Sequence, residues 1–102
     1  GKLFSFGRGY TGRLGHGDED ERVTPVLVEA LQDVWVSAVS AGHYHSLVAT
    51  EDGKLFSFGD GESGKLGHGD EEERLTPTLV EALRRVRVIA VSTGRDHSLV
   101  VT

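Results

Sequence analysis

The stretch GKLFSFGRGYTGRLGHGDE at residues 1–19 returns as GKLFSFGDGESGKLGHGDE at residues 53–71. Two shorter motifs recur at the same offset of 52 residues: LVEAL at 27–31 and 79–83, and HSLV at 45–48 and 97–100. Of the 50 aligned positions, 35 carry the same amino acid, and no residue is inserted between them. Self-similarity at a fixed period of this length is typical of repeat architectures. We therefore divide the chain into two repeats, 1–52 and 53–102.

The length and composition exclude several classes of protein. A chain of 102 residues has room for one small domain, and its formal net charge of −5 argues against a nucleic-acid partner, which needs clustered Lys and Arg. Without cysteine, it holds neither a disulfide nor a cysteine-ligated zinc. No apolar run approaches the ~20 residues of a membrane span, and no segment resembles a signal peptide, so we expect no membrane partner. The missing initial Met indicates a trimmed or engineered chain, or removal of that residue.

Inside each repeat, apolar residues recur with a period of two, which is typical of strands. Both alternating faces of residues 34–41 carry apolar side chains, so we expect this strand to be packed on both sides. Residues 45–50 and 54–59 are further strand-like runs, and the Asp52-Gly53 pair between them is a strong hairpin signal. A fourth, shorter strand is expected near 26–28 and 78–80, with a short helical turn at 28–31 as the alternative.

Four short strands per fifty residues are the signature of a β-propeller blade. The order of the motifs is more specific: Phe-x-Phe-Gly, Gly-x-x-Gly-x-Leu-Gly-x-Gly, Thr-Pro, and a Val-rich strand that ends in Gly-x-x-His-Ser-Leu. Over essentially all of both repeats, this order resembles the regulator of chromosome condensation repeat family. The resemblance implies an all-β fold, a β-propeller of four-stranded blades. Phe6 and Phe58 depart from it, since the family often has Trp there, and Arg13 and Lys65 stand where glutamine is common.

The resemblance also implies how strands are shared between blades. It places residues 34–41 and 45–50 in the inner half of a blade, and strands that begin at Lys54 and after Thr76 in the outer half. The chain then starts on an outer pair, completes one blade in the middle and ends on an inner pair. Two blades leave apolar edges that invite another chain. We expect head-to-tail closure with copies of itself into a ring of six or eight blades, and we favour the tetramer over the trimer.

The pattern G-x-G-x-x-G at 7–12 and again at 59–64 matches the dinucleotide-binding fingerprint, each time after an expected strand. That fingerprint needs a helix next, whereas the following Leu-Gly-His-Gly is expected to be a loop, because two glycines in three positions break helices. Asp60 and Glu62 would also place negative charge against a phosphate. We therefore interpret the motif as a structural loop and expect no cofactor.

The five histidines are the candidates for metal binding. His16 and His68 lie beside acidic runs, and the sequence leaves open whether these loops bind a cation. His43 and His45 form a His-x-His pair, a half-site for zinc if both lie on one strand, but no third ligand is evident. For His45 and His97 we favour a structural role, in which one ring nitrogen satisfies a backbone carbonyl at the junction of two blades.

Little in the sequence favours catalysis. Ser46 and Ser98 each follow a histidine, but adjacent residues on a strand face opposite sides, so the base would have to come from a neighbouring blade. The chain has no cysteine and no pair of carboxylates at apolar positions. We therefore expect that it is not an enzyme.

The repeats differ most in the expected loops, where propellers carry their binding surfaces. Arg84, Arg85 and Arg87 form the one basic cluster, and Trp35 is the one tryptophan. We expect a cation–π contact between Arg87 and Trp35 across blades, with exposure of both to water as the alternative. The candidate interaction residues are Arg8, Tyr10, Trp35, His43, Tyr44, Asp60, Glu62, Arg84, Arg85, Arg87, Arg95 and Asp96.

Two functions are consistent with these patterns. The first is structural: a designed or excised two-blade unit that assembles with copies of itself into a closed propeller. The second is a protein-binding module, because the family it resembles includes an exchange factor for a nuclear GTPase that also docks on chromatin, ubiquitin-ligase accessory domains and plant ultraviolet receptors. None of their functional residues carries over position by position. The identity between the repeats favours the first function, since repeats of one template stack through a single kind of interface.

Overall fold

The computed structural model describes all residues, 1–102, and contains eight strands and four short 3₁₀ turns. No helix in it is long and apolar enough to cross a membrane. In chain order the elements are β1 (Phe4–Gly7), η1 (Tyr10–Gly12), β2 (Arg22–Leu27), η2 (Glu29–Leu31), β3 (Val36–Ala41), β4 (His45–Thr50), β5 (Leu55–Gly59), η3 (Glu62–Gly64), β6 (Arg74–Leu79), η4 (Glu81–Leu83), β7 (Ala90–Thr93) and β8 (Ser98–Val101).

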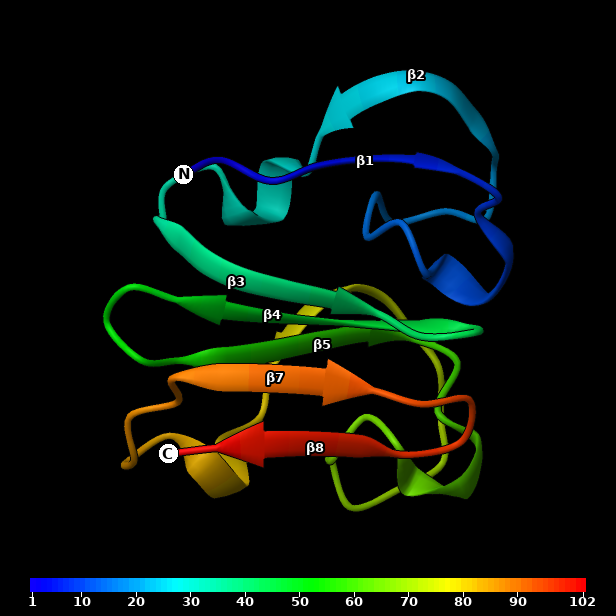
Figure 1. Cartoon of the computed structure of the whole chain (residues 1–102). Helices are drawn as coiled ribbons and strands as arrows, with labels where there is room; N and C mark the ends of the chain where they lie inside the picture. The colour runs from blue at the N-terminus through cyan, green and yellow to red at the C-terminus, as the bar shows by residue number, and fades with distance from the viewer.

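The strands form three antiparallel sheets. The middle sheet has four strands in the order β3-β4-β5-β6, whereas β1-β2 and β7-β8 are two-stranded. Figure 1 shows the two-stranded sheets on either side of the middle one, with β1 and β2 at the top and β7 and β8 below. Because β3 and β4 come from the first repeat and β5 and β6 from the second, the complete four-stranded blade spans the boundary between the repeats. The expected order of outer pair, whole blade and inner pair is confirmed.

The tight turn between β4 and β5 forms at Asp52-Gly53, as expected. Gly53 has a φ of +88°, which glycine adopts without strain, and its N–H donates to the Thr50 carbonyl at 2.9 Å. A Cβ at Gly53 would lie 2.7 Å from Cγ of Arg87, so the turn also leaves room for the segment that precedes β7. The Thr50 hydroxyl donates to the Asp52 carboxylate, and this bond lowers the pKa of Asp52.

Several expected strand boundaries are wrong. β2 begins at Arg22, well before residue 26, and β6 repeats this shift. Pro25 is accommodated inside β2 because β2 is an edge strand, whose free side needs no N–H donor. The helical alternative is realised as well, since η2 follows β2 and ends at Leu31. β3 begins at Val36, later than expected.

The core consists of two apolar clusters, one on each side of the middle sheet. The first contains Val28, Leu31, Val48 and Phe58, and the second contains Leu47, Ala49, Leu55, Val80 and Val88. β4 is packed on both faces, since Val48 enters the first cluster and Leu47 the second. β3 is not packed on both faces as expected: Val39 is exposed, because no strand pairs with the free edge of β1 next to it.

Candidate functional site

The two terminal sheets each leave a strand without a partner on one side: β1 pairs only with β2, and β8 pairs only with β7. Residues on these strands are exposed although their repeat counterparts in the middle sheet are buried. Phe6 is 61% exposed and Phe58 is 2% exposed. Leu99 is likewise 61% exposed and Leu47 is 1% exposed. Unpaired strand edges with exposed apolar residues mark interaction sites, so we take the open edges of β1 and β8 as the candidate site.

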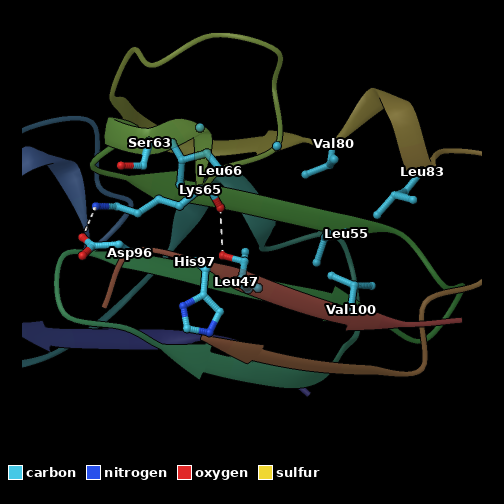
Figure 2. A pocket seen from close by; sticks show the side chains of 13 residues that line it. Leu47, Leu55, Ser63, Lys65, Leu66, Val80, Leu83, Asp96, His97 and Val100 are labelled. Atoms are coloured by element: carbon cyan, nitrogen blue, oxygen red, sulfur yellow. Dashed lines mark hydrogen bonds and ion pairs between the residues drawn. The ribbon is translucent and has the colours of Figure 1, made fainter. Parts of the chain in front are cut away.

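A cavity of about 380 Å³ lies beside β8 (Figure 2). Its apolar wall comes from the middle sheet, the segments that follow η3 and β6, η4 and β8: Leu47, Leu55, Leu66, Val80, Leu83 and Val100. Three of these, Val80, Leu83 and Val100, are the repeat counterparts of the residues that pack with the Phe58 ring in the first cluster. The cavity is therefore lined by the same residue types that surround the Phe58 ring in the first cluster.

A second apolar hollow, of about 240 Å³, lies between β1 and the middle sheet. Its lining includes Leu3, Phe4, Phe6, Val39, Val48 and Phe58. Each open edge thus has an apolar hollow next to it: β8 has the first cavity, and β1 has this groove.

A buried lysine closes the polar end of the first cavity. The side chain of Lys65 is 1% exposed, and its Nζ lies 2.6 Å from Oδ2 of Asp60 and 4.0 Å from Oδ1 of Asp96. Figure 2 shows the contact with Asp96. A buried ammonium is stable only when a carboxylate compensates its lost hydration, and Asp60 is near enough to do so. The repeat counterpart of Lys65, Arg13, has no such partner and instead lies 4.8 Å from the centroid of the Tyr44 ring.

His45 lies at the junction between the middle sheet and β8, but it contacts a hydroxyl and not the expected backbone carbonyl. Its Nε2 is 2.9 Å from Oγ of Ser98, and that hydroxyl donates to the Lys65 carbonyl at 2.8 Å. Ser98 therefore accepts a bond from Nε2–H, which places the proton on Nε2. Nδ1 is buried and has no partner. Protonation would place a positive charge in this buried position, so burial lowers the pKa of His45 below its usual 6.5.

This junction predicts a pH dependence of stability. The unfolded chain takes up a proton at the ordinary histidine pKa of 6.5, whereas folded His45 does so only at lower pH. The free energy of unfolding should therefore fall as the pH drops below about 6.5, until the folded-state pKa is passed. Burial lowers the pKa of His68 too, so its contribution has the same sign. Urea unfolding measured between about pH 5 and 8 tests this, within the range where histidine titrates.

A His45→Gln variant is the control, since an amide can still donate to Ser98 but does not titrate. Its stability should depend less on pH in this range, and an unchanged slope would contradict the assignment.

Asp18 and Asp70 affect stability in a separate, more acidic pH range. Their bonds to Arg22 and Arg74 lower their pKa values from 3.8, so their contribution is lost only as the pH falls through the lowered values.

The histidine-rich segments do not converge on a metal site. His43 lies in the turn between β3 and β4 with its ring centroid 4.3 Å from that of Tyr44, whereas His45 is buried at the junction, so the zinc half-site is wrong. His16 and His68 contact the hydroxyls of Ser5 and Ser57 at 2.9 and 2.8 Å. No group of three or more His, Cys, Asp or Glu lies where it could hold a metal ion.

The Ser98–His45 pair does bring a histidine from a neighbouring sheet to a serine, as the sequence left open. A general base must accept the hydroxyl proton, but here the Ser98 hydroxyl donates to the Lys65 carbonyl. The Ser46 hydroxyl donates to the Arg13 carbonyl at 2.9 Å in the same way. Both hydroxyls are engaged in structural bonds, and neither is activated. The G-x-G-x-x-G segments are loops with single 3₁₀ turns, so they present no helix N-terminus to a phosphate.

The candidate interaction loops lie at two opposite ends of the strands. Figure 1 shows the β3–β4 and β7–β8 turns at one end and the β4–β5 hairpin at the other. The first end carries Arg8, Tyr10, His43, Tyr44, Asp60, Glu62, Arg95 and Asp96, and the second carries Trp35, Arg84, Arg85 and Arg87. At the first end, the Asp60 N–H donates to the Tyr44 carbonyl at 2.9 Å.

The expected cation–π contact between Arg87 and Trp35 is not formed within the chain. Lys2 takes that place, with Nζ 5.2 Å from the centroid of the Trp35 ring. Arg87 instead donates to the Glu51 carbonyl at 2.7 Å, and the Glu51 N–H donates to the Trp35 carbonyl at 2.8 Å. The backbone of the β4–β5 hairpin satisfies the guanidinium, so it does not need the ring.

The interpretation of the sequence as loops and strands missed four residues that shape the site: Phe6, Lys65, Ser98 and Leu99. The repeat alignment could have identified Phe6 and Leu99, because it pairs each with a core position of a complete blade. No signal marked the Lys65–Asp60 pair, since the first repeat has arginines at both positions.

Comparisons with known proteins agree with this geometry. The family described as "Regulator of chromosome condensation (RCC1) repeat" matches residues 1–49 and 52–101. The chain is 42% identical over 102 residues to E3 ubiquitin-protein ligase HERC2 of Homo sapiens, covering all of this chain and 2% of that protein. It is 35% identical over 101 residues to Ultraviolet-B receptor UVR8 of Arabidopsis thaliana, covering 99% of this chain and 23% of the receptor.

Solved structures match as well. The crystal structure of Prp20p from Saccharomyces cerevisiae superposes with a TM-score of 0.82 at 26% identity, and the structure of Kap60 bound to yeast RCC1 (Prp20) with 0.80 at 26%. Each match covers 99% of this chain but only about a quarter of the solved one, 27% and 26% respectively. The arrangement of antiparallel sheets is thus that of an RCC1 β-propeller, and by its two matched repeats the chain belongs to the Regulator of chromosome condensation (RCC1) repeat family.

Proposed function

We propose that the chain is a non-catalytic propeller unit, with repeats 1–52 and 53–102, that assembles head-to-tail with copies of itself into a closed homo-oligomeric ring. One observation carries the proposal: the residues exposed on β1 and β8 are the repeat counterparts of core residues in the middle sheet. A second copy supplies what each edge lacks, since the β7-β8 pair and the β1-β2 pair are the two halves of one blade. The 35 identical positions among the 50 aligned ones are consistent with an origin of the repeats from one template, by design or by duplication.

The assembly is a head-to-tail contact, so it either closes or grows into a filament. Two blades per chain restrict closed rings to even blade numbers, and we propose eight blades in a tetramer in preference to six in a trimer. Closure removes both open edges, which otherwise expose large apolar side chains such as Phe6 and Leu99 to water.

Light scattering after size exclusion tests the assembly. We expect a sharp species of about 44 kDa, since one chain has a mass of 11.0 kDa. A species of about 33 kDa would replace the tetramer with the trimer and keep the proposal. A folded monomer at every concentration up to about 1 mM, a range in which even weak association is seen, would overturn it.

A second candidate function is binding of another protein through the loops at the first end of the strands. Cations and aromatic rings stack there: Arg8 lies 5.5 Å from the Tyr10 ring centroid, and Arg13 lies 4.8 Å from that of Tyr44. Exposed aromatic and arginine side chains are enriched where proteins bind each other. The yeast relative was studied for its binding to Gsp1p and histones, and it is also seen bound to Kap60.

Purified histones, Gsp1p and Kap60 are suitable probes for this second function. If the loops bind one of them, titration calorimetry should give a saturable isotherm. The affinity should fall at least tenfold in a variant that carries both Tyr10→Glu and Tyr44→Asp. These changes install the residues of the second repeat, so they leave the strands untouched. If no probe binds, or if the unaltered chain and the variant bind with equal affinity, loop-mediated binding of these probes is contradicted.

A further inference from the structure

We propose that the Phe6 ring of one copy fills the cavity beside β8 of another, and that β8 and β1 pair in the register of β4 and β5. The inference rests on the proposed head-to-tail assembly and adds the interlocking residues to it. Its basis is that the chain already contains one complete example of the contact, at the junction between the β1-β2 sheet and the middle sheet.

The register follows from the repeat. In the middle sheet β4 pairs antiparallel with β5 through Ser46↔Phe58, Leu47↔Ser57 and Val48↔Phe56. Shifting each residue by the 52-residue offset between the repeats gives the contact between copies: Ser98↔Phe6, Leu99↔Ser5 and Val100↔Phe4. A slip by one residue would turn every side chain to the opposite face, so this register is the one that buries the apolar set.

The cavity beside β8 fits the Phe6 ring because the repeat counterparts of its wall residues already surround the ring of Phe58. A Cβ added to Gly15 would lie 2.9 Å from Cε2 of Phe58, so that ring packs directly against the glycine. Gly67 is the counterpart of Gly15 and lines the cavity, and nothing but Val80, at 3.4 Å, lies over it. Figure 2 shows Val80 and Leu83 facing Val100 and Leu55 across the hollow. The space above Gly67 is therefore the vacant equivalent of the Phe58 site.

A polar contact accompanies the ring. Within the chain, His45 of the middle sheet donates to Ser98, whose hydroxyl donates to the Lys65 carbonyl. Ser46 already donates to the Arg13 carbonyl in the equivalent way, and no ring is bonded to its oxygen. The repeat counterpart of His45 is His97, which is exposed at the end of the chain that provides the cavity. His97 of that copy therefore reaches Ser46 of the copy that provides Phe6.

A charge at Phe6 tests the ring contact. Phe6→Glu should hold the chain at 11 kDa in light scattering at concentrations where the unaltered chain assembles. Tyr10→Glu is the matched control, because Tyr10 is exposed to a similar extent, 59% against 61%, and its counterpart in the second repeat is Glu62. This control should assemble like the unaltered chain. Both variants should keep the strand signal in circular dichroism, since neither side chain is in the core of a single chain.

Cysteine pairs test the register, in a chain that has no cysteine of its own. Ser5→Cys with Leu99→Cys places two thiols directly opposite each other between copies, so oxidation should give covalent multimers. Phe4→Cys with Leu99→Cys places them on opposite faces and should cross-link at least tenfold more slowly.

The outcomes separate the two proposals. If the unaltered chain is monomeric at every concentration, the assembly itself is wrong. A different result is that the unaltered chain assembles while Phe6→Glu assembles equally well, or while Phe4→Cys with Leu99→Cys cross-links faster than Ser5→Cys with Leu99→Cys. In either case the assembly stands, and the proposed ring contact or register is wrong.

Discussion

Replacing Phe58 with Ala is expected to lower the free energy of unfolding by about 3–5 kcal/mol, the usual loss for a buried phenyl ring. The ring is 2% exposed, and it joins Val28 and Leu31, which follow the β1-β2 sheet, to Val48 of the middle sheet. Its removal leaves a hollow between the sheets that their backbones cannot close. Small domains are stable by only about 5–15 kcal/mol, so the midpoint of chemical unfolding should shift visibly.

Phe6→Ala is the matched control, because the same substitution is made at the repeat counterpart. Both variants are best compared in a Leu99→Glu background, which charges the open edge of β8 and keeps assembly from contributing to stability. There, Phe6→Ala should change the free energy of unfolding by no more than about 0.5 kcal/mol, as for an exposed site. Equal losses for the two variants would mean that Phe6 is buried within a single chain, contrary to the structure.

The fold was predictable from the sequence to the level of strands and their order. The repeat and the period of two led to four strands per unit and to one complete blade between two halves. The starts of β2 and β6 were not predictable, because Pro25 and Pro77 were taken to precede the strand. Proline is tolerated there only because these strands lie at the edge of their sheets, which is a property of the topology and not of the local sequence.

The site was predictable in part. Identical residues in the two repeats have opposite environments, as Phe6 and Phe58 show, because burial is decided by the neighbouring sheet and not by the residue. The His45–Ser98 contact joins residues 53 apart, so no local pattern contains it. The loops were correctly placed outside the strands, but their division between two ends of the molecule needed the fold.

The second large effect concerns Asp60, where replacement with Arg should destabilise the fold by about 3 kcal/mol, in the range for a buried ion pair that loses one partner. From the alignment the change appears harmless, since it installs the residue that the first repeat has at this position, Arg8. The structure predicts otherwise, because Nζ of Lys65 is buried 2.6 Å from the Asp60 carboxylate. A guanidinium there would leave a buried ammonium with only the more exposed Asp96, 4.0 Å away.

The reverse exchange, Arg8→Asp, is the matched control for this prediction. Arg8 is exposed and its one recorded contact is with the Tyr10 ring, so the expected change is below about 1 kcal/mol, the size of an exposed cation–π contact. A rescue experiment isolates the cause: Lys65→Met in the Asp60→Arg background removes the buried charge and should recover most of the lost stability, because a buried ion pair can be replaced by an apolar side chain of similar volume. Urea unfolding of the four chains gives the comparison. If Asp60→Arg is as stable as the unaltered chain, Lys65 reaches water, and the polar end of the cavity beside β8 is open and not sealed by the ion pair.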